Sequence, residues 1–142
     1  MFNKWLVYIV VVSLIYFGVH LHRVEKLMMP VSGANVNSYN KKSFWFYPWG
    51  KSGTHKGVDI FASEGTPILA STSGLILFAG EIEVGGNVVI LLGSKWRIHY
   101  YAHLKEIKTL SFSFVKSGTL VGTVGTTGNA KGKPPHLHYA IV

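Results

Sequence analysis

The chain has 142 residues, of which 48% are apolar and 14% charged, a length and composition that suit one compact domain and exclude a disordered chain. It contains no cysteine, which excludes disulfides, iron–sulfur clusters, cysteine-ligated zinc and a thiol nucleophile. Its net charge of +8 favours a polyanionic partner such as acidic cell-wall polymer, anionic lipid or nucleic acid.

The chain begins with an apolar segment, residues 5–21, which holds no charged residue and is flanked by Lys4 and Arg23. Its seventeen residues would rise about 25 Å as a helix, close to the ~30 Å hydrocarbon core of a bilayer. We therefore expect one N-terminal transmembrane helix over residues 1–23. An uncleaved signal anchor is favoured over a cleaved signal peptide, because the nearest small-residue cleavage motif, Ser32-Gly33-Ala34, lies well downstream.

Either alternative sends the rest of the chain across the cytoplasmic membrane. An anchor would hold the domain at the membrane, in the periplasm or outside the cell, and a cleaved signal peptide would release it. Residues 24–43 mix Met and Pro with small polar residues, and this composition indicates a linker to a domain over residues 44–142.

The domain opens with an aromatic run, Phe44-Trp45-Phe46-Tyr47-Pro48-Trp49. We expect this run to form core, or a lid over a small β domain. A stacking surface for a flat substrate is the alternative.

From residue 66 onward, short runs rich in β-branched and aromatic residues are separated by glycines, which predicts strands. The runs cover residues 67–70, 74–80, 87–92, 96–104, 120–124 and 137–142. The expected fold is mostly β, a small antiparallel sheet arranged as a sandwich or open barrel.

Five of the seven histidines lie outside the apolar segment, namely His55, His99, His103, His136 and His138. In a strand, residues two apart point to the same face, so both imidazoles of the His136-Leu137-His138 run should project together while Leu137 enters the core. His99 and His103 share one face of their strand if that strand is regular.

His55 and the only aspartate, Asp59, are four residues apart, and Gly57 between them permits a tight backbone path. Imidazole nitrogen and carboxylate oxygen are good zinc ligands, and catalytic zinc takes three protein ligands and a water. His55, Asp59 and one of His136 and His138 make such a set, with spare imidazoles to act on the water. The rival motifs H-E-x-x-H and G-x-S-x-G are absent.

Six segments, in the same order along the chain, resemble the motifs of the M23 zinc metallopeptidases, the lysostaphin/LytM-type cell-wall endopeptidases. They are His55–Ile60 with H-x-G-x-D-(I/L), Gly65–Ala70 with G-T-P-V-x-A, Gly85–Ile90 with G-G-x-x-V, Tyr101–Leu104 with Y-x-H-L, Gly118–Gly128 with G-x-x-I-G-x-x-G-x-T-G, and Pro135–Tyr139 with P-H-L-H-F. The resemblance runs from about Tyr47 to Val142.

The resemblance implies a Zn²⁺ ion bound by His55, Asp59 and His138 in a groove of the β domain, with His103 and His136 as catalytic imidazoles near the bound water. It also implies an activity, that of a zinc-dependent endopeptidase. Such an enzyme hydrolyses peptide cross-links or bridge peptides of bacterial peptidoglycan through a metal-activated water.

Two other functions are weighed beside this one. A non-enzymatic scaffold or activator with the same fold would differ by the absence of bound zinc. A basic nucleic-acid-binding β domain fits the charge and the aromatic residues, but the apolar export segment and the histidine set argue against a nucleic acid partner. Nothing in the sequence determines the oligomeric state, the bond cleaved or which of His103 and His136 is the base.

Overall fold

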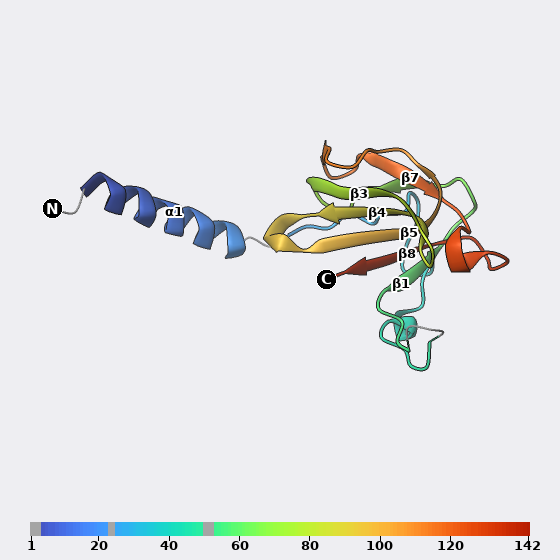
Figure 1. Cartoon of the computed structure of the whole chain (residues 1–142). Coiled ribbons are helices and arrows are strands. Elements are labelled where there is room, and N and C mark those ends of the chain that lie inside the picture. The colour runs from blue at the N-terminus through green and yellow to red at the C-terminus, as the bar shows by residue number, and fades with distance from the viewer. Residues whose placement is uncertain (1–3, 23–24, 50–52) are drawn as a thin grey trace.

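The computed structural model describes residues 4–22, 25–49 and 53–142 (Figure 1). Its elements are, in chain order, α1 (Lys4–His22), η1 (Lys41–Ser43), β1 (Val58–Phe61), β2 (Pro67–Leu69), β3 (Gly74–Ile82), β4 (Gly86–Leu92), η3 (Ser94–Trp96), β5 (Ile98–Ile107), β6 (Phe114–Val115), β7 (Leu120–Val124), η4 (Gly128–Ala130) and β8 (His136–Ile141).

The strands form an open antiparallel sheet in the order β1-β8-β5-β4-β3-β6, with the β2–β7 pair joined to it through β5 (Figure 1). Every strand pair is antiparallel. One edge of β5 pairs with β4, and the other pairs first with β8 and then with β7. The predicted mostly β, antiparallel fold is thus confirmed as an open sheet.

Each of the six predicted strand runs corresponds to an observed strand, within a few residues at each end. The runs correspond to β2, β3, β4, β5, β7 and β8. β6 was not predicted because it has only two residues. β1 was not predicted because its four residues overlap the His55–Asp59 motif and are too few for an alternation of apolar and polar residues to be recognised.

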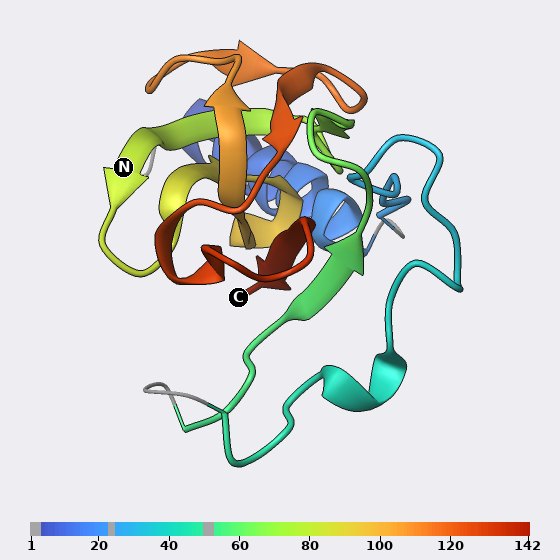
Figure 2. The ribbon, with the colours of Figure 1, turned by 90° about the vertical axis from the view of Figure 1, so that its right-hand side faces the viewer.

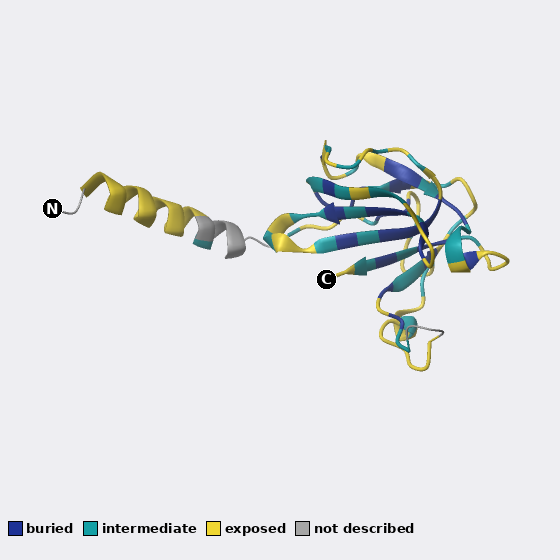
Figure 3. Ribbon diagram, in the orientation of Figure 1, coloured by how far each residue is buried: buried dark blue, intermediate teal, exposed yellow. Residues whose placement is uncertain are grey.

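The core follows the alternation of side chains along the strands (Figure 3). Ile76, Leu91, Tyr101 and Leu137 are fully buried on one face. Because successive strand residues point to opposite faces, their neighbours Tyr100 and His138 lie on the other face, where they are only partly covered. The second face is therefore available for a site.

The segment predicted as a linker packs against the domain. Val31 is buried in the core and forms a bridge with Ile68. The Leu69 amide donates to the Pro30 carbonyl at 2.7 Å, and the Met28 amide donates to the Ser71 carbonyl at 2.9 Å. Residues 25–31 thus fix where the chain enters the domain.

The apolar N-terminal segment is helical, and its described side chains are exposed, from Trp5 to Tyr16 (Figure 3). Residues 1–3 and Arg23 of the predicted segment lie outside the described residues. Within the described ranges, no helix meets the length and hydropathy that a bilayer crossing requires. The predicted transmembrane helix is therefore not confirmed.

The aromatic run 44–49 does not form core, so the first of the two arrangements expected for it is wrong. All six residues are exposed, and Trp45 and Tyr47 keep 62% and 73% of their surface. The physical reason is that the run pairs with the chain near His55 instead of crossing the sheet, since the Trp45 amide donates to the His55 carbonyl and the His55 amide to the Phe46 carbonyl. Figure 2 shows this part of the chain as an arm that extends away from the strands.

Candidate metal centre

The three predicted metal ligands, His55, Asp59 and His138, meet on the partly covered face of the sheet. Nε2 of His55 lies 3.1 Å from Oδ1 of Asp59 and 3.0 Å from Nδ1 of His138, and the last two atoms are 2.9 Å apart. Three ligands bound tetrahedrally to zinc at about 2.0–2.2 Å lie roughly 3.4 Å from one another. The triangle of ligand atoms is therefore close to the size that zinc requires, and its two nitrogens and one oxygen are a donor set that zinc favours.

The antiparallel pairing of β1 with β8 brings two of these ligands together. Asp59 lies directly opposite His138 in this register, so both side chains project from the same face. His55 precedes β1 by three residues and turns back over the pair. A one-residue slip between β1 and β8 would move Asp59 to the core face and abolish the site.

Gly57 makes the turn between His55 and Asp59 possible by having no side chain. A Cβ atom at this position would lie 2.6 Å from the Tyr139 carbonyl oxygen and 2.9 Å from Nε2 of the His138 imidazole. The tight path expected for this glycine is confirmed, and its cause is the close approach of β8.

The His55 ring is held from two sides. Its Nδ1 lies 2.8 Å from the Ser43 carbonyl, which can only accept, so Nδ1 carries the proton and Nε2 presents a lone pair to Asp59 and His138. The Trp49 indole stacks on the ring with centroids 4.5 Å apart and an angle of 34° between the planes. The aromatic arm therefore orients a candidate metal ligand.

His103 reaches the same face through a bulge in β5. The register between β4 and β5 shifts between Asn87 and Val89, and β5 exchanges β8 for β7 as its neighbour after Ala102. His103 has a φ of 67°, a left-handed conformation that is uncommon outside glycine. The extra residue breaks the alternation of faces, and so the His103 ring lies 5.1 Å from His136 and 6.0 Å from His138.

The bulge also explains why His99 is not part of the site. The expectation that His99 and His103 share a face held only for a regular strand. His99 instead points into the core, where its Nδ1 lies 2.7 Å from the Tyr139 hydroxyl and 3.2 Å from the Ser71 hydroxyl.

Thr127 and Asn87 hold the bulge in place. Nδ1 of His103 donates to the Thr127 carbonyl at 2.9 Å, and the Thr127 hydroxyl donates to the Leu104 carbonyl at 2.9 Å. The Asn87 side-chain amide donates to the carbonyls of Leu104 and Lys105, both at 3.1 Å. The Nε2 atom of His103 is thereby left as the free, proton-accepting nitrogen.

His136 is held in the same way as His103. Its Nδ1 donates to the Pro134 carbonyl at 2.8 Å, and its Nε2 lies 3.9 Å from Oδ1 of Asp59. Leu137 is fully buried between the two histidines, which confirms the predicted orientation of the His136-Leu137-His138 run. His103 and His136 thus face the three ligand atoms without belonging to their triangle.

The surroundings of the site set two protonation states. Burial raises the pKa of Asp59, but the hydrogen bond from His138 and the charges of the surrounding imidazoles outweigh burial and bring that pKa below its ordinary 3.8. Burial and the neighbouring His136 lower the pKa of His103 to about 4, despite the opposing effect of the Thr127 carbonyl. At neutral pH the carboxylate is therefore ionised and the His103 imidazole is neutral.

Sequence reasoning missed the groups that orient the imidazoles. They are the carbonyls of Ser43, Thr127 and Pro134, the Asn87 amide and the Trp49 ring. Backbone carbonyls carry no sequence signal. Asn87 and Thr127 lie within the quoted glycine-rich segments, and their polar side chains next to Gly86 and Gly128 were the available signal.

Comparison with known proteins points to a single family. The model of peptidase family M23 matches residues 53–142. Lysostaphin from Staphylococcus simulans is 38% identical over 109 residues, which are 73% of this chain and 22% of that protein. The peptidoglycan DD-endopeptidase ShyC of Vibrio cholerae is 37% identical over 93 residues, which are 66% of this chain and 21% of that protein.

Among solved structures, the catalytic domain of lysostaphin from Staphylococcus simulans superposes with a TM-score of 0.64 at 36% identity, covering 72% of this chain and 79% of that domain. The chain spans only about a fifth of the length of these two curated relatives. The likeness is therefore to one catalytic domain, and the match over residues 53–142 includes the five predicted site residues His55, Asp59, His103, His136 and His138.

Proposed function

The chain belongs to peptidase family M23, and from this membership we propose that it is a zinc-dependent endopeptidase that hydrolyses peptide cross-links or bridge peptides of bacterial peptidoglycan. One observation carries the proposal. The ligand atoms of His55, Asp59 and His138 meet within hydrogen-bonding distance of one another, and two further imidazoles, each fixed by a carbonyl, face them.

In this proposal His55, Asp59 and His138 hold the metal. A bound Zn²⁺ would supply a Lewis acid and lower the pKa of a coordinated water to about 7. The ionised Asp59 offsets part of the charge of the ion, and the Ser43 carbonyl keeps the Nε2 lone pair of His55 directed at the site.

His103 and His136 handle protons. Each has its Nδ1–H donated to a carbonyl, so Nε2 is the atom that accepts a proton as a water attacks the peptide carbonyl. The resulting imidazolium stabilises negative charge on the carbonyl oxygen and then returns its proton to the leaving amine. The pKa of His103, about 4, keeps this imidazole in its neutral form throughout the neutral range.

The substrate class comes from the relatives. One of them is named as a peptidoglycan DD-endopeptidase, another as a glycyl-glycine endopeptidase. A +8 chain suits an acidic wall polymer.

Mass spectrometry of muropeptides tests the proposal. Purified peptidoglycan is incubated with the protein, with the protein and a chelator, and with Asp59→Asn. We expect new peptide fragments that disappear with chelator, return with added zinc and are absent with Asp59→Asn. A folded protein that binds no zinc and releases no fragment would instead support the scaffold or activator function.

We also propose that the domain works outside the cytoplasmic membrane and that residues 4–22 tie it to the membrane. Two observations support this location. Most of the described side chains of α1 are apolar, and they are exposed, with Trp5, Leu14 and Tyr16 each keeping more than 60% of their surface; peptidoglycan, the proposed substrate, lies beyond that membrane. Flotation of the full chain with lipid vesicles is the test, and cleaved secretion is the alternative that a protein remaining free of lipid would favour.

A further inference from the structure

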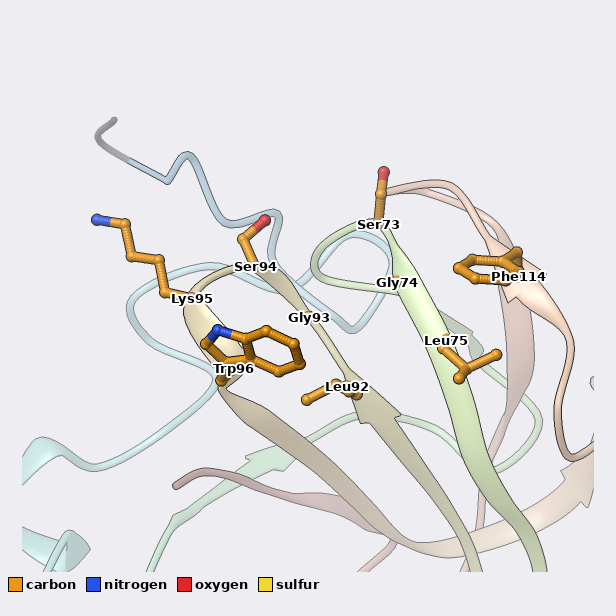
Figure 4. A pocket seen from close by; sticks show the side chains of 9 residues that line it. All are labelled: Ser73, Gly74, Leu75, Leu92, Gly93, Ser94, Lys95, Trp96 and Phe114. Atoms are coloured by element: carbon orange, nitrogen blue, oxygen red, sulfur yellow. The ribbon is translucent and has the colours of Figure 1, made fainter. Parts of the chain in front are cut away.

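The end of the domain far from the metal centre carries exposed aromatic side chains. We call it the β4–β5 end, and it comprises residues 71–75, 92–97 and 114–118 together with residues 25–28. Trp96 and Phe114 keep 69% and 83% of their surface here. They stand on either side of a surface pocket of about 420 Å³ that Leu75 and Leu92 also line (Figure 4).

The β4–β5 end lies opposite the metal centre along β5. Ala102 pairs with the ligand His138, whereas His99, three residues earlier, pairs with Ile141 near the far end of β8. At about 3.3 Å per residue, the five steps from Ala102 back to Arg97 cover roughly 16 Å. The turn between β3 and β4, which holds Glu83, lies at the metal end, because the His103 amide donates to the Gly85 carbonyl.

The chain enters the domain at the β4–β5 end and is tied down there. The Glu25 carboxylate accepts from the Thr72 hydroxyl at 2.7 Å and forms an ion pair with Arg97 at 3.3 Å. Its side chain is only 7% exposed. His22, the last residue of α1, is three steps from Glu25, and three extended residues reach at most about 11 Å. Wherever the apolar helix partitions, this end of the domain must lie beside it.

Charge at the β4–β5 end is positive. The cations there are Lys26, Lys95, Arg97 and Lys116. Glu25 is the one carboxylate side chain among the described residues of this end, and it is already paired with Arg97. The other acidic side chains, Asp59, Glu64, Glu81, Glu83 and Glu106, lie outside the residues that define this end.

We propose that the β4–β5 end rests on an anionic lipid surface. Tryptophan and basic side chains beside an apolar helix are typical of the membrane–water interface, and the polar headgroups would take the Trp96 ring while acidic lipids face the cations. In this orientation the metal centre points away from the bilayer, toward the wall. The inference rests on the proposed membrane location and is independent of the zinc chemistry.

The absence of cysteine from the chain allows a clean test. Ser94→Cys in the full-length protein places one thiol at the β4–β5 end, and Glu83→Cys places one at the metal end. Each is labelled with an environment-sensitive fluorophore and bound to vesicles of phosphatidylcholine with phosphatidylglycerol. We expect the emission of the Ser94 label to shift to the blue and to be quenched by headgroup spin-labelled lipid, and the emission of the Glu83 label to change in neither respect.

A charge reversal with a matched control provides the second measurement. Lys95→Glu should reduce the quenching of the Ser94 label, while Lys131→Glu, an equal change in charge at an exposed site in the loop before β8, should not. Vesicles of phosphatidylcholine alone should give weaker quenching than the anionic mixture.

Three results would overturn the inference, and each points elsewhere. If the protein floats with vesicles while its Ser94 label stays in water, the membrane anchor is supported and the docking of the β4–β5 end is contradicted. A blue shift in detergent that grows with protein concentration indicates a second copy of the chain as the partner. If the protein does not float, the proposed membrane location is contradicted as well. Peptide release from peptidoglycan tests the proposed function separately.

Discussion

Gly57 shows how closely the strands approach around the metal centre. Its missing side chain leaves room for the Tyr139 carbonyl and for the His138 ring, each within 3 Å of where a Cβ would stand. A backbone oxygen cannot rotate aside as the end of a long side chain can. Any side chain here must therefore displace β8 and one of the proposed ligands.

Gly57→Ala should weaken zinc binding by about 10- to 100-fold, the size of effect that follows when the support of a metal ligand is disturbed. Competition with a chromophoric chelator measures it. Lys56→Ala, at the exposed neighbouring position, is the control and should leave the affinity unchanged. Equal affinities for Gly57→Ala and the unmodified protein would mean that the ligand triangle does not depend on this contact.

His99 makes a second prediction at this scale, on stability. Burial lowers the pKa of His99 below its ordinary 6.5, and the nearby Arg97 lowers it further against the opposing effect of Glu25. Nε2 of His99 is buried and has no hydrogen-bond partner among the described residues. Below about pH 6.5 the His99 imidazole is therefore protonated in the unfolded chain but not in the folded chain. The free energy of unfolding falls as the pH drops toward the pKa of His99 in the folded chain.

Urea unfolding at about pH 7.5 and about pH 5.5 tests this prediction. The unmodified protein should lose more stability between the two pH values than His99→Gln does, whatever their difference at the higher pH. The prediction fails if the two proteins lose the same amount.

The bulge in β5 is the element that brings His103 to the face of the candidate metal centre. It turns His103 toward the ligands and lets β5 exchange β8 for β7, so that one strand serves both halves of the sheet. The left-handed backbone at His103 is strained, and the two hydrogen bonds from Asn87 to the next carbonyls offset that strain.

Asn87→Ala should therefore lower kcat by at least about 10-fold, and by no more than the 10²- to 10⁴-fold that a general acid or base contributes. It should also cost roughly 0.5–1.5 kcal/mol of stability, since the carbonyls of Leu104 and Lys105 lose a donor on the Asn87 side chain. Zinc content should be unchanged, because His103 is not a proposed ligand. Steady-state hydrolysis of a peptide substrate and metal analysis measure the two effects, with Asn129→Ala, an exposed asparagine in η4, as the control. Loss of zinc in Asn87→Ala would contradict the assignment.

The same element shows how far sequence reasoning reaches. Short runs of β-branched and aromatic residues between glycines located β2, β3, β4, β5, β7 and β8, and the two-residue period of a strand placed His136 and His138 on one face. The period could not predict the bulge, because one extra residue is invisible to a pattern that only counts alternation. It therefore left His99 and His103 as equals, and the M23 resemblance was needed to separate them.

The exposed position of the aromatic arm, residues 44–49, could not be predicted from the sequence for a different reason. Six adjacent aromatic and proline residues normally signal burial, but residues 44–49 lie beside His55 and outside the sheet, where Trp49 covers a ligand ring. The composition of a segment indicates that its side chains tend to be buried, but it does not indicate which surface they pack against.

At the scale of the molecule, the metal centre joins distant parts of the chain. His55 and His138 are 83 residues apart in sequence, and they meet only in the folded domain. Zinc that binds the folded chain and not the unfolded one must therefore stabilise the whole domain.

Removing the metal should lower the melting temperature. At a free zinc concentration 100-fold above Kd the stabilisation is about 2.7 kcal/mol, which corresponds to a shift of several degrees for a domain of this size. Calorimetry with and without chelator measures it. Asp59→Asn, which lacks one proposed ligand, should melt at a temperature that chelator does not change. An identical melting temperature for the unmodified protein in both conditions would show that these residues hold no metal.

In the proposed mechanism five side chains have two roles. Three of them bind zinc and two transfer protons, and they are His55, Asp59 and His138 for zinc and His103 and His136 for protons. Bound zinc per chain, measured together with peptide release from peptidoglycan, tests this assignment of roles most directly in two variants of the same strand, His138→Ala and His136→Ala. The assignment predicts that His138→Ala loses both zinc and cleavage, whereas His136→Ala keeps its zinc and loses about 10²- to 10⁴-fold in cleavage rate. Zinc retained by His138→Ala, or cleavage retained by His136→Ala, would contradict it.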